Sequence, residues 1–322
     1  MNTVRLLVVF VLVSACASPS TPPAASAPDE AKLSRRAFEP TFEGRPVIKG
    51  ISYGPFREGQ SPAGPFPTRE QILEDLKILA PEWHMIRIYG SGDPAEDVLS
   101  VIREHSLPIK VMLGVWIAPD EDNERGVRNV IDLANRYQDV VFAVNVGNEC
   151  QVFWSAHRFP MDRLIEYIRE VRAAIEQPVT TADDYNFWNK PESHAVAKEV
   201  DFLLLHAYAM WNGKALEEAV SWTAETVDAI QREHPDLEIV IGETGWATEL
   251  NPEGSENEHI KAPAGIEEQQ RFFREFTTWA GGTGVPYFYF EAFDEPWKGS
   301  SDPREVEKHW GLYNVDRTPK SP

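Results

Sequence analysis

Two glutamates have the surroundings expected of residues that do chemistry together. Glu149 ends the stretch Asn145-Val-Gly-Asn148-Glu149, and Glu243 lies in Gly242-Glu243-Thr-Gly-Trp246, so each sits in a glycine-containing turn. A pair of carboxyl groups facing each other across a bound sugar chain can break a glycosidic bond. One protonates the leaving oxygen, and the other attacks the anomeric carbon or activates water. Either glutamate alone could be a solvated loop residue, so the hypothesis depends on the pair.

The elements that must position these glutamates alternate between short apolar runs and longer amphipathic segments. The apolar runs predict strands buried on both faces: Val47–Tyr53, Met85–Tyr89, Ile109–Trp116, Val140–Val146, Pro178–Ala182, Phe202–Tyr208, Leu237–Gly242 and Pro286–Phe290. The amphipathic segments predict helices, the first opening with a capping box at Thr68: Thr68–Leu79, Asp93–Glu104, Glu124–Tyr137, Pro160–Ile175, Pro191–Glu199, Leu216–Glu233 and Ile266–Ala280.

Eight strand–helix units in about 275 residues predict an α/β fold with a single (β/α)8 TIM barrel. The competing arrangement is a doubly wound open sheet, which usually has a glycine-rich phosphate loop after its first strand. Here that position reads Gly54-Pro-Phe-Arg-Glu-Gly59, which is no such loop. In a barrel, the polar and aromatic residues at the strand ends converge on one mouth. The cluster Asp183-Asp184-Tyr185 after the fifth strand could line that mouth or cap the next turn.

Several stretches, in the same order along the chain, resemble glycoside hydrolase family 17, the β-1,3-glucanase and β-1,3-glucanosyltransferase family. The matching stretches are Gly50-Ile-Ser-Tyr-Gly54, Met85-Ile-Arg-Ile-Tyr89, Val144-Asn-Val-Gly-Asn-Glu149, Ile241-Gly-Glu-Thr-Gly-Trp246, Phe290-Glu-Ala-Phe-Asp-Glu-Pro-Trp-Lys298 and His309-Trp-Gly-Leu-Tyr313. The resemblance implies a retaining mechanism, with Glu149 as general acid/base and Glu243 as nucleophile. Two carboxyl groups about 5 Å apart cannot both ionise easily, so we expect Glu149 to be protonated and Glu243 charged.

The same resemblance implies a set of substrate-binding residues. Asn148 would bind the sugar 2-hydroxyl, and Tyr208 would orient the carboxylate of Glu243. Trp246 and Trp297 would offer faces on which sugars stack. The full set predicted to contact substrate is Tyr53, Tyr89, Asn148, Tyr208, Trp246, Glu291, Glu295, Trp297 and Lys298.

The overall charge narrows the class of partner. The net charge of −20 disfavours nucleic acid, which needs a basic surface, and also disfavours a polyanionic substrate. A neutral β-glucan polysaccharide or oligosaccharide is compatible with it. Cys16 and Cys150 are the only cysteines, so we expect no disulfide within the mature chain and no cysteine-based metal site, and we predict no cofactor.

The N-terminus predicts export and lipid anchoring. Arg5, the apolar run Leu6–Val13 and Val13-Ser14-Ala15-Cys16 form a signal peptide that ends in a motif resembling a bacterial lipobox. We therefore expect a signal peptide over 1–15, lipidation of Cys16, a flexible tether over 16–45 and a catalytic domain over 46–322. The expected location is the outer membrane, at its periplasmic face or the cell surface, and the expected state is a monomer.

Two other functions remain open from the sequence, and a third is disfavoured. A sugar hydroxyl could replace water as the acceptor, which would make the protein a β-1,3-glucanosyltransferase. A surface lipoprotein that binds glucan without cleaving it is another possibility, although both glutamates are present. A metal-dependent barrel hydrolase would call for a His-x-His pair after the first strand, where this chain has Ser52-Tyr53-Gly54.

Overall fold

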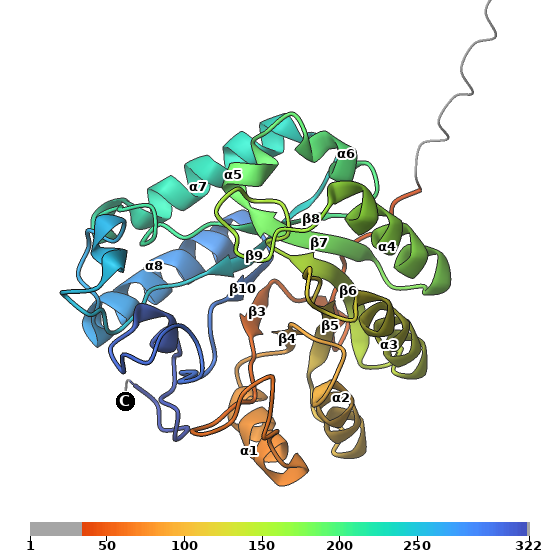
Figure 1. The fold of residues 1–322 in the computed structure, drawn as a ribbon, viewed down its shortest axis with the longest axis horizontal. Coiled ribbons are helices and arrows are strands. Elements are labelled where there is room, and N and C mark those ends of the chain that lie inside the picture. Colours follow the sequence, from red (N-terminus) through yellow and green to blue (C-terminus); the bar gives the residue numbers. More distant parts are fainter. Residues whose placement is uncertain (1–33, 321–322) are drawn as a thin grey trace, which may run out of the picture. The chain divides into compact units, whose positions relative to one another are not determined.

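A computed structural model describes residues 34–320, which form a closed barrel of eight parallel strands with helices on its outside (Figure 1). The predicted TIM barrel is confirmed. The barrel strands are β3 (Lys49–Ser52), β4 (Met85–Ile88), β5 (Lys110–Val115), β6 (Val141–Asn148), β7 (Val179–Asp184), β8 (Leu203–His206), β9 (Ile239–Thr244) and β10 (Tyr287–Tyr289). Each pairs in parallel with the next along the chain, and β10 pairs with β3 to close the ring.

The helices follow the predicted alternation with two differences. They are α1 (Arg69–Leu79), α2 (Ala95–Glu104), α3 (Asn123–Arg136), α4 (Met161–Ala174), α5 (Tyr185–Trp188), α6 (Ser193–Ala197), α7 (Leu216–Glu233) and α8 (Ile266–Thr283). Two short helices, α5 and α6, stand where one was predicted after β7. Among the described residues, β10 is followed by the 3-10 turn η2 (Val306–Lys308) instead of an α-helix, and η1 (Ser255–Glu258) lies before α8. The predicted capping box at Thr68 is present.

Two buried clusters stabilise the barrel. The larger one joins the outer faces of the strands to the helices. The smaller one takes one side chain from each of seven strands, β4 to β10, together with Phe38 and Phe202. Along each strand its members alternate with those of the larger cluster, and successive side chains of a strand point to opposite faces, so this cluster fills the interior below the mouth. Every described helix is too short or too polar to cross a bilayer.

The segment before residue 46 packs against the end of the barrel where the strands begin. Phe38 is 3% exposed, and its ring lies 4.7 Å from that of Phe202. The backbone N–H of Arg36 donates to Asp201, just before β8, at 2.8 Å. A small hairpin of β1 (Thr41–Phe42) and β2 (Arg45–Pro46) follows. Residues 34–45, assigned to the tether from their composition, are therefore part of the packed domain, while the signal peptide, Cys16 and the tether up to residue 33 lie outside the described residues.

The C-terminal tail returns to the first helix of the barrel. Arg317 donates from Nε and Nη2 to the two carboxylate oxygens of Asp75 in α1, each at 2.8 Å, and both side chains are buried. Arg57 adds a third contact to Asp75 at 2.7 Å. This bidentate ion pair fastens the end of the chain beside the seam where β10 meets β3.

Candidate active site

The structure brings the two predicted carboxyl groups to the same end of the barrel. Glu149 directly follows β6, and Glu243 is the penultimate residue of β9. The imidazole of His206, the last residue of β8, lies between them. Its Nδ1 is 2.9 Å from Oε1 of Glu149, and its Nε2 is 3.3 Å from Oε1 of Glu243. Contact with a single ring places both glutamates in one site.

The turn that carries Glu149 has a specific backbone geometry. Gly147 has φ +81°, and a Cβ there would lie 2.8 Å from Sγ of Cys150, so glycine is required. Glu149 itself has φ +50°, an uncommon conformation for a non-glycine residue that is found at functional sites. The carboxylate of Asp183 accepts the backbone N–H groups of Gln151 and Val152 and holds the chain that follows.

Donors surround both carboxylate oxygens of Glu243. Arg87 Nη1 and the Tyr89 hydroxyl donate to Oε1 at 2.6 and 2.9 Å, and the Tyr208 hydroxyl donates to Oε2 at 2.7 Å. The predicted orienting contact from Tyr208 is therefore present. Hydrogen bonds to a charged carboxylate favour its ionised form, so this environment suits a nucleophile.

Arg87 organises the site, although it was not identified from the sequence. Its buried guanidinium contacts Glu243, and its Nη2 donates to Oδ1 of Asn148 at 2.5 Å. This contact fixes the orientation of the Asn148 amide, and its N–H groups are then available to a ligand in the cleft. A signal was present: an arginine inside the buried apolar strand Met85–Ile88 must have a partner.

The two glutamates are driven in opposite directions. Burial raises the pKa of Glu149 well above its usual range, and the negative charges of Glu243 and Asp184 raise it further. Burial also opposes ionisation of Glu243, but the His206 ring in its protonated form, the Arg87 guanidinium and the Tyr208 hydrogen bond hold its pKa below the usual value. The expected division into one protonated and one ionised carboxyl group agrees with these directions.

A second polar cluster follows β10. The ammonium group of Lys298 donates to both oxygens of Glu291, at 2.8 and 2.7 Å, and lies 2.8 Å from Oε2 of Glu295. The indole N–H of Trp297 donates to Oε1 of Glu295 at 3.1 Å. A Cβ at Gly54 would lie 2.0 Å from that same oxygen, so glycine lets the first strand's loop approach the cluster.

A cleft of about 900 Å³ runs over these groups and outward between α2 and α3. Among the predicted residues, those that line it are Tyr53, Tyr89, Asn148, Glu149, Glu243, Glu295, Trp297 and Lys298. Three half-exposed aromatic side chains also line it: Phe66, Trp116 and Trp297. Of these, only Trp297 was predicted, because strand-end aromatics cannot be sorted into exposed and packed ones without the fold.

Tyr208 does not line the cleft, because its hydroxyl donates to Glu243, and three further predicted binding residues have other roles in the structure. Trp246 is fully buried, donates to the carbonyl of Pro263 and packs on the ring of Phe272, so it has no face open to a sugar. This corrects the expectation that it stacks on substrate. Glu291 is also fully buried and holds Lys298 without lining the cleft. Tyr53 lines the cleft only with its ring, since its hydroxyl donates to Asp75 at 3.2 Å.

The two aspartates of the acidic cluster are the last residues of β7; Asp183 supports the chain after Glu149, and Asp184 caps the next helix, so capping is the alternative that the structure favours. Asp184 accepts the backbone N–H of Asn186 at 2.8 Å as the N-cap of α5. The thiol of Cys150 is buried, as expected for a packed cysteine.

Glu307 of η2 is a further acidic residue in the cleft that was not predicted. Burial raises its pKa to about 7, while Lys298 lowers it and Glu243 raises it.

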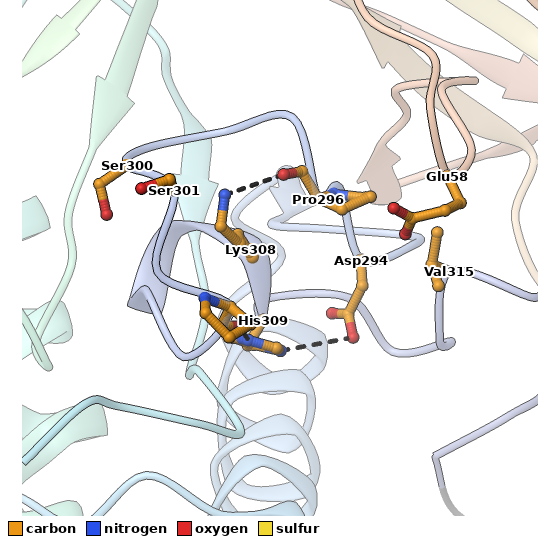
Figure 2. Close-up of a pocket in the computed structure, with 9 residues that line it drawn as sticks. Glu58, Asp294, Pro296, Ser300, Ser301, Lys308, His309 and Val315 are labelled. Carbon is orange, nitrogen blue, oxygen red and sulfur yellow. Dashed lines mark hydrogen bonds and ion pairs between the residues drawn. The ribbon is translucent and has the colours of Figure 1, made fainter.

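A separate cavity of about 390 Å³ is lined by residues that include Asp294, Pro296, Lys308 and His309 (Figure 2). Three of the polar side chains that line it, Asp294, Lys308 and His309, have protein partners. Lys308 donates to the carbonyl oxygens of Pro296 and Lys298, and Asp294 accepts from Lys320 at 2.7 Å. We interpret this network as a support for the loop that carries Glu295 and Lys298. Across residues 34–320, no cluster of three or more His, Cys, Asp or Glu side chains is arranged to hold a metal ion.

All the residues that line the cleft lie within a domain shared with known proteins. The family model of the BtgE/BtgC glycoside hydrolase domain matches residues 50–311. A protein of Arthroderma benhamiae named glucan 1,3-beta-glucosidase is 29% identical over 272 residues, covering 80% of this chain and 86% of that protein.

Two solved structures share the barrel at 24% identity. The endo-laminarinase from Formosa Hel1_33_131 has a TM-score of 0.74 and covers 84% of each chain. An active-site mutant of the Rhizomucor miehei β-1,3-glucanosyltransferase in complex with laminaritriose has a TM-score of 0.71 and covers 85% of this chain and 96% of its own. At this identity they are evidence for the fold.

Proposed function

The chain belongs to the BtgE/BtgC glycoside hydrolase domain family, and from this premise we propose that it cleaves β-1,3-glucan of the laminarin type with Glu149 and Glu243. The resemblance to glycoside hydrolase family 17 seen in the sequence motifs is thereby confirmed. The observation that carries the proposal is the pair of glutamates in one site, whose surroundings raise the pKa of Glu149 and lower the pKa of Glu243.

The proposed reaction is a double displacement. In the first step, Glu243 attacks the anomeric carbon, the glycosidic C–O bond breaks, and Glu149 gives its proton to the leaving oxygen. In the second step, Glu149 takes a proton from water, the water oxygen bonds to the anomeric carbon, and the bond to Glu243 breaks. Arg87, Tyr89 and Tyr208 support this order because their donors keep Glu243 ionised and aimed.

The proposed substrate agrees with the character of the cleft. The Arthroderma relative is named for a 1,3-β-glucosidase activity, and the Formosa neighbour for an endo-laminarinase. The half-exposed rings of Phe66, Trp116 and Trp297 can pack on sugar faces, while the amide N–H groups of Asn148 can bind hydroxyls. The cleft is open at the mouth of the barrel, which favours internal cleavage of a polymer.

The test is a digest of laminarin by the purified domain (residues 34–322), with Glu243→Gln as the inactive control and the products separated over time. Shorter oligosaccharides from the wild type alone would support hydrolysis, and a β-anomeric first product in NMR would support retention. Products longer than a laminarioligosaccharide substrate would identify a transferase. An intact polymer would overturn the proposal.

We further propose that the protein is exported and anchored through Cys16 as a monomer at the outer membrane. The N-terminal sequence motif supports this, and Phe38 fastens the start of the domain at the barrel end opposite the cleft. An anchor attached there would leave the mouth free for a polymer. Full-length protein and Cys16→Ala should differ in palmitate labelling and membrane fractionation, and the purified domain should elute as a monomer.

A further inference from the structure

The imidazole of His206 contacts both catalytic carboxyl groups and has no role in the mechanism above. It is fully buried at the end of β8. Its Nδ1 lies at hydrogen-bond distance, 2.9 Å, from Oε1 of Glu149. Its Nε2 has no hydrogen-bond partner among the described residues, although Oε1 of Glu243 is 3.3 Å away.

We propose that His206 is a positioning residue whose Nδ1–H donates to Oε1 of Glu149, leaving Oε2 as the oxygen that carries and delivers the catalytic proton. This inference rests on the proposed function, because it assumes that Glu149 is the general acid. It assigns the two oxygens of that carboxyl group to separate tasks, one held by the protein and the other directed to the glycosidic oxygen.

A neutral imidazole fits this role. Burial lowers the pKa of His206 to about 4, and the neighbouring Arg87 lowers it as well, against the opposing effect of Glu243. The ring is therefore uncharged above that pH. The charged and titratable groups that face it are Glu149, Glu243, Arg87, Asp183 and Asp184.

The contacts favour the tautomer with its proton on Nδ1. Glu243 already receives three hydrogen bonds, from Arg87, Tyr89 and Tyr208, so it needs no donor from Nε2. In the other tautomer, Nδ1 could only accept, and the proton of Glu149 would point at the imidazole and away from the substrate. A donor at Nδ1 also suits both half-reactions, because Oε1 is an acceptor whether Glu149 is protonated or ionised.

The first test separates support of the acid from general packing by changing the leaving group. A natural glycosidic oxygen needs the proton of Glu149, whereas 2,4-dinitrophenolate leaves without protonation. We expect His206→Leu to lower kcat on laminarioligosaccharides about 100-fold, while the pre-steady-state burst from 2,4-dinitrophenyl β-laminaribioside stays within about 3-fold. Azide, which needs no general base, should restore turnover of that substrate.

His206→Asn is the conservative variant, because its amide nitrogen can occupy the place of Nδ1. Its kcat on laminarioligosaccharides should be at least about tenfold higher than that of His206→Leu. The matched control is His194→Asn, which changes a half-exposed histidine 2.7 Å from Glu233 and should leave activity unchanged. Equal loss of the burst and of oligosaccharide hydrolysis in His206→Leu would show a merely structural role and overturn the proposal.

The second test does not depend on activity. Long-range 1H–15N NMR spectra of the histidine-labelled domain, with His206 assigned from its absence in His206→Asn, should show a neutral ring protonated at Nδ1 between pH 5 and 8. A ring protonated at Nε2, or a charged ring, would overturn the proposal even if the enzyme cleaves laminarin. An inactive wild type would instead overturn the proposed function, and the NMR spectra would still report the protonation state of His206.

Discussion

At the scale of single residues, two chemically identical side chains are given opposite tasks by their neighbours. Glu149 faces acidic groups and a neutral imidazole, whereas Glu243 faces a buried guanidinium and two phenolic hydroxyls. The division of roles therefore lies in Arg87, Tyr89, Tyr208 and His206 as much as in the glutamates. Substitutions at these neighbours should therefore change the pH dependence of the reaction more than they change the fold.

The first prediction is the shape of the pH profile of kcat/KM. Activity requires Glu243 ionised and Glu149 protonated. Because the pKa of Glu243 lies below the ordinary glutamate value and that of Glu149 well above it, activity should rise at acidic pH and fall only well above pH 4.5. Glu149→Gln, assayed with a dinitrophenyl glycoside, should lose the alkaline limb. An alkaline limb that persists in this variant would contradict the assignment.

The second prediction concerns Arg87. Replacing it by Met removes a charge and a 2.6 Å donor from Glu243, so kcat should fall about 10²–10³-fold, as for loss of a preorganised donor. Because Arg87 lowers the pKa of Glu243, its removal should also shift the acidic limb of the profile to higher pH. Steady-state rates across the pH range would measure both effects. An unshifted acidic limb would show that Arg87 serves packing alone.

At the scale of elements, the strands and most helices were predictable because burial on both faces gives parallel strands continuous apolar runs. The catalytic glutamates were predictable because barrel chemistry gathers at strand ends. The individual aromatic contacts were not. Trp116 and Trp246 both follow strands, yet one lines the cleft and the other packs under α8. Whether such a tryptophan is exposed or packed depends on the length of its loop and the position of the next helix, and the residues beside the tryptophan indicate neither.

The third prediction contrasts these two tryptophans. Trp116→Ala should raise KM for long laminarioligosaccharides about tenfold, equivalent to about 1.4 kcal/mol, with little change in the urea midpoint, because the ring is 37% exposed. Trp246→Ala should instead lower the free energy of unfolding by about 3–5 kcal/mol, since a fully buried ring is removed. Oligosaccharide kinetics and urea denaturation on both variants would measure this. The reverse pattern would place Trp246 in the binding site.

At the scale of the whole molecule, both ends of the described chain are fastened to the barrel. Arg317 ties the C-terminal tail to α1, and Phe38 closes the interior at the end opposite the cleft. Composition assigned residues 34–45 to a flexible tether, because the whole stretch 17–45 is rich in Ser, Pro, Ala and charged residues. The segment is nevertheless ordered in the structure, because Phe38 packs into the barrel interior and the backbone of Arg36 is hydrogen-bonded to Asp201. The ring of Phe38 fills space that would otherwise be a void at the end of the barrel where the strands begin.

The fourth prediction tests this extension of the domain. Phe38→Ala should lower the free energy of unfolding by about 3–5 kcal/mol, because its ring is 3% exposed and packs against Phe142 and Phe202. The matched control is Phe153→Ala, whose ring is 71% exposed and whose loss should change stability by no more than about 0.5 kcal/mol. Urea denaturation of residues 34–322 followed by tryptophan fluorescence would compare them. Equal stability of the two variants would mean that the packed domain begins after residue 38, and the tether would then end where composition places it.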